Sequence, residues 1–173
     1  MATRKTTLDR PQRAYVTLTE GAANGGNVVQ FPSSFSTADQ KGIEILSYSL
    51  ELGSTLNFKD VFPGDEDGFC FGIGHLYYAG VVPGTRCTPG VIDLQWNEFR
   101  LETAVGFALI KRCMKIDFDV PQIAHPASLY AYLRGVSLAV ALSGYISIDY
   151  RLVDLPDEDY KDILQSILIQ NQI

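Results

Sequence analysis

The sequence is poor in histidine, and this scarcity excludes several kinds of site. Only His75 and His125 are present. Neither has a second histidine, cysteine or carboxylate at metal-ligand spacing, so the side chains for a histidine-rich metal centre inside a β-barrel are missing. We therefore expect no metal, no organic cofactor and no catalytic residue, with His75 in a strand and His125 just before a helix.

Cysteine is also scarce, and its pattern is irregular. Cys70, Cys87 and Cys113 are odd in number, widely spaced and contain no C-x-x-C pair. The pattern favours free thiols in a reducing compartment. A disulfide between two of these residues, or between two chains, is the alternative.

Basic residues are outnumbered, which argues against a broad nucleic-acid-binding face. The 173 residues include 14 Lys and Arg against 20 Asp and Glu, a formal net charge of −6, and only 20 % of the residues are charged. Proteins that grip nucleic acid over a broad surface usually have the opposite sign. Positive charge gathers only at the start, where Arg4, Lys5, Arg10 and Arg13 stand against Asp9. Residues 1–13 are either a frayed terminus or an arm that orders on a neighbouring subunit or on nucleic acid.

Catalytic and nucleotide-binding motifs are missing as well. The sequence has no G-x-S-x-G and no Walker motif, and Gly72-Ile73-Gly74 lacks the third glycine of a dinucleotide fingerprint. Residues 68–85 contain no charged residue, but they include five glycines and one proline. These residues suit strands and turns better than a membrane-spanning helix. Asp65, Glu66 and Asp67 form an acidic loop without the full EF-hand pattern, so we expect it to be solvated, and calcium binding is the alternative.

What the sequence has in abundance is alternation of apolar and polar residues, typical of half-buried strands. The alternating segments are residues 15–19, 28–31, 43–52, 69–75, 98–110, 114–120 and 136–152. Residues 136–152 keep one parity throughout, so we predict a single long strand, bent at Gly144, with its even-numbered side inward. Glycines 72 and 74 predict a sharp bend or a close approach by another backbone.

Two short helices are predicted. The first covers about residues 126–134, opened by Pro126 and closed by Gly135. The second covers about residues 156–169, with acidic residues in its first turn and an apolar stripe that begins at Tyr160. This stripe packs either on the protein's own sheet or on a neighbouring subunit.

About eight strands with Gly/Pro turns and two short helices indicate an all-β fold, best described as an eight-stranded jelly-roll sandwich or barrel. An immunoglobulin-like sandwich is second, because such domains are usually shorter and show a Cys…Trp…Cys arrangement that Trp96 does not complete here. We expect an arm at residues 1–13, a β-sandwich domain at 14–155 and a helix with tail at 156–173.

The late small-residue segment at residues 136–146 (VSLAVALSGYI), the closing segment at 150–154 (YRLVD) and the short basic arm together give the chain a recognisable pattern. The pattern resembles the single jelly-roll capsid proteins of tailless icosahedral viruses, including those that enclose a membrane. The resemblance implies a structural virion protein without enzymatic activity or small-molecule substrate. Its partners would be copies of itself, and a second capsid protein could join them. Since the arm is shorter than the Arg-rich arms that package RNA, it fits contact with an internal membrane or other proteins better than direct genome binding.

A second function class remains open. A lectin-like sandwich would bind carbohydrate through exposed aromatic side chains, and Tyr77, Tyr78 and Trp96 are the candidates. An enzyme is the third choice.

Overall fold

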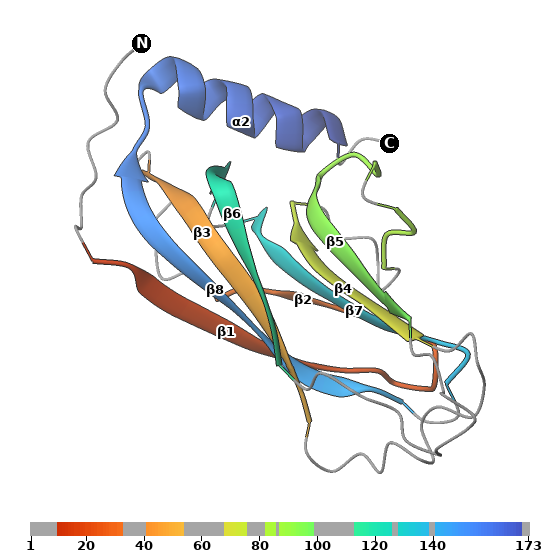
Figure 1. Cartoon of the computed structure of the whole chain (residues 1–173). Helices are drawn as coiled ribbons and strands as arrows, with labels where there is room; N and C mark the ends of the chain where they lie inside the picture. Colours follow the sequence, from red (N-terminus) through yellow and green to blue (C-terminus); the bar gives the residue numbers. More distant parts are fainter. Residues whose placement is uncertain are drawn as a thin grey trace.

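The computed structural model describes residues 10–32, 41–53, 68–75, 82–85, 87–98, 113–125, 128–138 and 141–170. These residues form eight strands and one long helix (Figure 1). The strands are β1 (Gln12–Thr19), β2 (Asn27–Gln30), β3 (Lys41–Leu52), β4 (Gly68–Gly74), β5 (Val91–Glu98), β6 (Cys113–Ala124), β7 (Tyr130–Val136) and β8 (Ser143–Asp154), and the helix is α2 (Asp157–Gln170).

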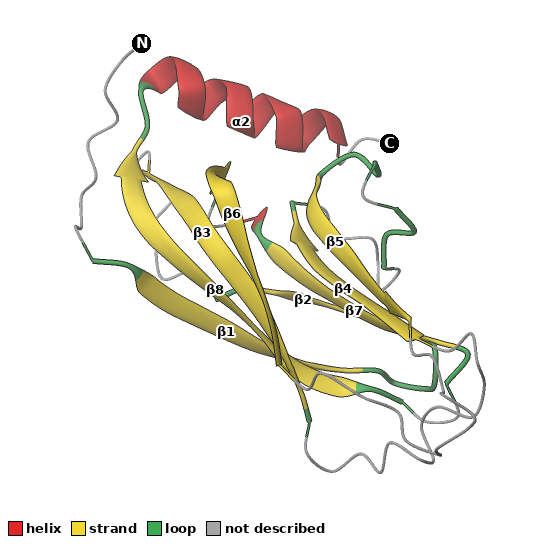
Figure 2. Ribbon diagram, viewed as in Figure 1, coloured by secondary structure: helices red, strands yellow, loops and turns green. Residues whose placement is uncertain are grey.

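The strands make two antiparallel four-stranded sheets, in the orders β1-β8-β3-β6 and β2-β7-β4-β5 (Figure 2). The first strand of the chain therefore pairs with the last, β2 with β7, β3 with β6 and β4 with β5. Such nested pairing arises when a long antiparallel hairpin is wrapped around a common core. The all-β prediction is confirmed, and the nested order fits the predicted jelly roll.

The core lies between the sheets, as the alternation predicted. Along β8 the even-numbered side chains Ile146, Ile148, Tyr150 and Leu152 are buried, so the predicted inward side is correct there. In β3 the inward side changes parity at a bulge between Ile45 and Ser47, which lets both Ile45 and Tyr48 face the core. The sequence predicted one continuous alternation through Leu46 and Tyr48, and it did not predict the bulge.

Strand β4 is buried on both faces, which explains its glycines. Phe69, Phe71 and Ile73 face the main core, while Cys70 joins a second cluster on the outer face with Val28, Val82, Leu94 and Tyr132. A Cβ atom added at Gly72 would collide with the backbone oxygen of Asp93, and one at Gly74 would lie 2.6 Å from the Gly90 oxygen. The predicted close approach by another backbone is therefore confirmed.

The helix predicted at residues 126–134 is wrong. Residues 130–134 belong to β7, which pairs with β2 on one side and β4 on the other. Pro126 and Gly135 gave local helix signals. Pairing on both edges satisfies the backbone groups of β7, and burial of Tyr132 and Leu133 stabilises the strand, so tertiary context overrides these signals.

The single long strand predicted at residues 136–152 is also wrong. Strand β7 ends at Val136, Ser137 adopts a left-handed conformation with φ of 57°, and β8 begins at Ser143. The two strands lie in different sheets, and Leu138 and Leu142, two even-numbered residues between them, are buried. The described even-numbered residues of 138–152 share one parity because they face the same core, although they do not belong to the same strand. Strand β5 was not predicted, and the alternating residues 99–110 lie outside the described part of the chain.

The C-terminal helix is confirmed, with α2 at Asp157–Gln170 against the predicted 156–169. Its first turn contains Asp157, Glu158 and Asp159, which the positive end of the helix dipole favours. Figure 1 shows α2 lying across one end of the sandwich.

Candidate assembly surfaces

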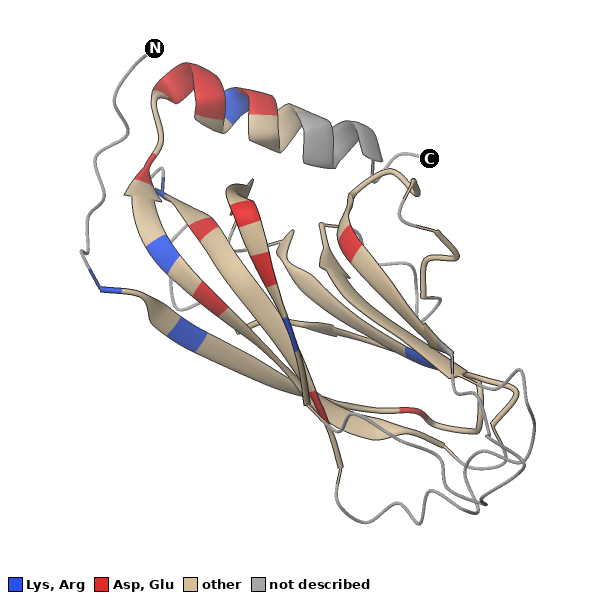
Figure 3. Cartoon of the chain, viewed as in Figure 1, with Lys and Arg blue, Asp and Glu red and all other residues tan. Residues whose placement is uncertain are grey.

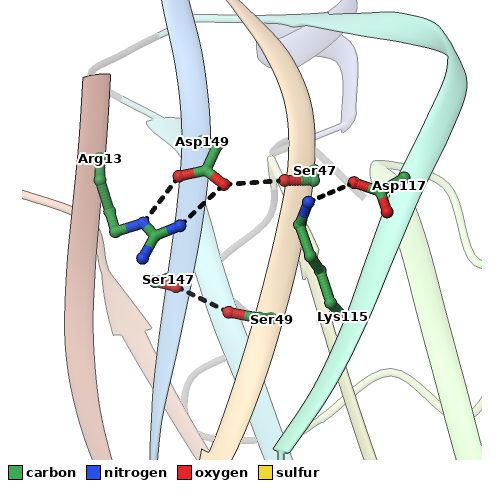
Figure 4. Close-up of polar contacts among 7 residues, drawn as sticks. All are labelled: Arg13, Ser47, Ser49, Lys115, Asp117, Ser147 and Asp149. Atoms are coloured by element: carbon green, nitrogen blue, oxygen red, sulfur yellow. Dashed lines mark hydrogen bonds and ion pairs between the residues drawn. The ribbon is translucent and has the colours of Figure 1, made fainter. Parts of the chain in front are cut away.

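The outer face of the β1-β8-β3-β6 sheet carries an ordered polar layer (Figure 4). The Arg13 guanidinium on β1 donates two hydrogen bonds to Asp149 on β8, at 2.7 and 3.0 Å. The Ser47 hydroxyl on β3 donates to the same carboxylate at 3.1 Å. This row ties three strands together across the sheet. The Arg13 hydrogen bonds are the main reason that the pKa of Asp149 is lowered, and the Ser47 hydrogen bond contributes.

A second row follows two residues further along the strands. Ser49 on β3 and Ser147 on β8 share a hydrogen bond of 2.8 Å, and on β6 Lys115 lies 2.6 Å from Asp117. Figure 3 shows that most charged residues of the strands belong to this sheet, while the β2-β7-β4-β5 sheet contains few. The two sheets therefore present chemically different faces.

Large apolar side chains are exposed at opposite sides of the sandwich. On one side Tyr15 of β1 is 67 % exposed and Tyr145 of β8 is 50 % exposed. Because Tyr15 pairs with Ser147 and Thr17 with Tyr145, the two tyrosines share the outer face and lie diagonally across the strand pair. Trp96 of β5 and Val120 of β6 are 48 % and 71 % exposed on two other edge strands. They lie at different levels, because the neighbours of Trp96 line a cleft with residues 113–116 at the start of β6, whereas Val120 is near the end of that strand.

A buried carboxylate holds the connections at one end together. Glu20 is 3 % exposed and accepts backbone N–H bonds from Gly26, Gly135 and Leu142, at 3.0, 2.8 and 2.7 Å. The Glu20 N–H also donates to the Leu142 oxygen at 2.9 Å. The β1–β2 connection is thereby fixed to the segment between β7 and β8.

Asn24 strengthens the same junction. It has a φ of 62°, a conformation that asparagine tolerates well, and its side-chain amide makes two hydrogen bonds with the backbone of Leu138, at 2.7 and 3.0 Å. Sequence reasoning missed both Glu20 and Asn24. The sequence does show an acidic residue, Glu20, directly after a predicted strand and before a Gly/Asn-rich loop. This position does not reveal which backbone N–H groups the carboxylate binds.

The two histidines directly follow β4 and β6, and His125 contacts α2. The His125 Nε2 is 3.3 Å from the Tyr160 hydroxyl of α2, and their rings are 5.6 Å apart. Burial lowers the pKa of His75, and the nearby His125 lowers it further. Burial also lowers the pKa of His125. His75 directly follows β4, close to its predicted strand position, whereas His125 precedes β7 and not the helix that the sequence predicted.

All three cysteines are free thiols, as the sequence favoured. Cys70 is buried, and burial raises the pKa of its thiol to about 11. Cys87 and Cys113 are exposed. Among the three, only the exposed pair is placed to react with solvent reagents.

Several predicted candidates lie outside the described residues. These are the acidic loop of Asp65, Glu66 and Asp67, and the aromatic residues Tyr77 and Tyr78. Trp96 is described and is 48 % exposed. Within that part no group of three or more metal-ligating residues is present, and no helix there is long and apolar enough to cross a membrane.

A cleft of about 400 Å³ opens between β5 and β6. Its lining is mixed, with Gln95 and Asn97 from β5, Met114, Lys115 and Ile116 from β6, and Phe71 and Cys113. The connection between the two strands, residues 99–112, lies outside the described residues.

Comparison with known proteins gives fold neighbours only. No family model and no curated protein matches the chain. Three solved virus structures are similar over most of their length. The structure of tomato aspermy virus matches with 8 % sequence identity and a TM-score of 0.44, and the match covers 91 % of this chain and 84 % of that chain. The capsid asymmetric unit of cyanophage Pam1 matches with 10 % identity and a TM-score of 0.44, and the match covers 90 % of this chain and 94 % of that chain. The structure of cocksfoot mottle virus matches with 7 % identity and a TM-score of 0.41, and the match covers 93 % of this chain and 100 % of that chain.

All three are viral structures, which agrees with the resemblance to capsid proteins stated from the sequence. Identities of 10 % or less and TM-scores below 0.5 carry no weight for the function of this chain. Its function has to be argued from its own strand order and surface.

Proposed function

We propose that this chain is a jelly-roll capsid protein, a structural subunit that associates with copies of itself to form an icosahedral viral shell. The observation that carries the proposal is the nested pairing of β1 with β8, β2 with β7, β3 with β6 and β4 with β5. Viral capsid domains are one of the main uses of such a double-sheet sandwich; lectin domains and metal-binding barrels are others.

The interior of the sandwich argues against the metal-binding use. Between the sheets lie packed apolar and aromatic side chains, including Tyr48, Phe69 and Phe71. His75 directly follows β4 and His125 directly follows β6, and the metal-binding use needs several histidines inside the barrel. This interior supports a structural role.

The exposed apolar side chains support self-association through two different surfaces. The β1 side offers Tyr15 and Tyr145, and the edge strands away from it offer Trp96 on β5 and, at a different level, Val120 on β6. A subunit of a closed shell meets neighbours on more than one side, and joining one side to the opposite side of the next copy produces a heterologous contact. In this proposal the protein resides in the virion, and residues 1–13 meet a neighbouring subunit, a second capsid protein, an internal membrane or the genome.

Two one-sided variants test the proposal by sedimentation velocity. The first carries Tyr15→Ser and Tyr145→Ser, and the second carries Trp96→Ser and Val120→Ser. We expect the natural protein to associate into large particles with rising concentration and each variant alone to stay small. An equal mixture of the variants should form dimers, since each then supplies one intact surface.

Other results would overturn parts of this account. A natural protein that stays monomeric and binds a glycan array would support the lectin-like alternative instead. If each variant alone formed dimers and mixing them formed no larger amount of dimer, the contacts would join identical surfaces of two subunits. Circular dichroism of both variants checks that the sandwich is intact.

A further inference from the structure

One row of polar side chains crosses the whole outer face of the β1-β8-β3-β6 sheet and has opposite charges at its two ends. Arg13 on β1 lies opposite Asp149 on β8, which lies opposite Ser47 on β3. Ser47 in turn lies opposite Asp117 on β6 (Figure 4). Since β1 and β6 are the edge strands of this sheet, one edge is basic and the other acidic at the same level.

The neighbouring row also has ends that attract each other. It begins with Tyr15 on β1, passes through Ser147 and Ser49, and ends with Lys115 on β6. Tyr15 is 67 % exposed, and the Lys115 side chain is 52 % exposed. An ammonium group is attracted to the face of an aromatic ring. Two successive rows therefore combine a β1 end and a β6 end of complementary chemistry.

The charged groups at the two edges are accessible and have room for a further partner. The side chains of Arg13 and Asp117 are 64 % and 70 % exposed. Arg13 uses two of its guanidinium N–H groups on Asp149, and a guanidinium has five. Asp117 lies 2.6 Å from Lys115, and a carboxylate can accept from more than one donor. Both groups can therefore form one more ion pair without losing their present one.

The backbone of both edges is regular at this level. Strand β1 pairs with β8 at eight successive residues without a shift, and residues 113–117 of β6 pair with β3 in the same way. An edge strand leaves every second N–H and C=O on its free side open to another strand. Beyond Asp117 the register with β3 skips residues 118–121, and Pro121 has no N–H to donate. The regular part of β6 is thus the part that ends the two rows.

We propose that β1 of one copy docks beside residues 113–117 of β6 of the next copy and continues the sheet across the contact. This inference rests on the proposed self-association and names the surfaces that meet. Three antiparallel pairings separate β1 from β6, so a second copy in the same orientation presents β1 antiparallel to β6, as in the rest of the sheet. The contact is heterologous, because it joins two different edges.

Continuing the rows into the next copy fixes the register of the contact. Arg13 of the next copy comes to lie beside Asp117, and Tyr15 of the next copy beside Lys115. The charges then alternate from Lys115 and Asp117 of one copy to Arg13 and Asp149 of the next. Opposite charges facing each other across neighbouring strands are stabilising, and like charges are destabilising, so the charges select this register.

Charge exchange in the full-length protein tests the docking, with the association constant measured by sedimentation equilibrium. Arg13→Glu and Asp117→Lys each bring like charges together, and each alone should lower the constant about tenfold or more. An equal mixture of the two variants has opposite charges at every mixed contact and should recover to within about threefold of the natural protein. Glu158→Lys and Lys161→Glu, at exposed positions of α2, are the matched controls and should change the constant less than about twofold.

A further variant leaves Arg13 and its contact with Asp149 untouched. Lys115→Asp combined with Asp117→Lys keeps the net charge and an ion pair within β6, but it places a cation at the level of Arg13 of the next copy. The association constant should again fall about tenfold, while circular dichroism stays unchanged.

The possible failures are distinguishable. A natural protein that does not associate overturns both the docking and the proposed function. If the natural protein associates and the charge exchanges leave its association constant unchanged, or if mixing does not restore it, the docking of β1 on β6 is wrong and the proposed function stands.

Discussion

The Tyr48 hydroxyl on β3 donates a hydrogen bond of 2.7 Å to the carboxylate of Asp93 on β5, so this polar contact crosses the sandwich from one sheet to the other. Tyr48 is 1 % exposed and its ring packs against Phe71 and Phe118. Asp93 also accepts a hydrogen bond from Gln95 at 2.7 Å. The contact fixes how β3 and β5 are placed within a largely apolar core.

Tyr48→Phe should lower the free energy of unfolding by about 1.5–3 kcal/mol, the usual range for a hydrogen bond to a charged group. The ring packing is retained, so the loss isolates the hydroxyl. Urea denaturation measures it. Tyr145→Phe, on the exposed outer face, is the matched control and should change stability by less than about 0.5 kcal/mol. Equal effects of the two substitutions would show that the cross-sheet contact contributes nothing.

Glu20→Ala should be among the most damaging single substitutions in the chain. It leaves the N–H groups of Gly26, Gly135 and Leu142 without their acceptor, and each buried orphan costs about 1–3 kcal/mol. The total is a large share of the stability of an ordinary domain. Chemical denaturation compares it with Glu51→Ala, an exposed glutamate on β3. A small effect of Glu20→Ala would mean that water replaces the carboxylate.

The Asp149 carboxyl should titrate below its ordinary pKa of 3.8, chiefly because of Arg13. In Arg13→Gln the pKa of Asp149 should rise toward the ordinary value, and Ser47→Ala should raise it by less. The lowered pKa means that this row favours the folded state above about pH 4 and loses that contribution as the pH falls further. Carbon-detected NMR titration of the carboxyl gives the values. A larger rise in Ser47→Ala would reverse the assigned order of causes.

Ser137→Gly should stabilise the protein by about 0.5–1 kcal/mol, because Ser137 has a φ of 57° and glycine adopts that conformation without steric cost. Ser137→Val should destabilise it, since a β-branched residue is poorly tolerated there. The control is Ser147→Gly, placed in the middle of β8, which should lower stability. Thermal melts of the three variants decide whether the chain really turns at Ser137.

The sequence predicted what depends on local alternation. Strands β1, β2, β3, β4, β6 and most of β8 were found, because their inward and outward residues differ in polarity. It also located α2, because acidic residues precede an apolar stripe. The order of the strands in the sheets could not be read from the sequence, since alternation defines a buried face but not a partner.

The failures have the same physical origin. Residues 126–134 contain helix start and stop signals, yet β7 is stabilised by neighbours on both sides that lie far away in the sequence. Residues 136–152 keep one parity because β7 and β8 enclose the same core from opposite sheets. Glu20 acts through backbone groups of three separate segments, and backbone groups leave no trace in residue identity.

Electron microscopy of the concentrated natural protein tests most directly whether this chain builds a shell. The account predicts closed, round particles of uniform diameter, which the variant with Tyr15→Ser and Tyr145→Ser fails to form although its circular dichroism is unchanged. Dispersed single subunits in both samples, at concentrations where capsid proteins assemble, would contradict the proposed function.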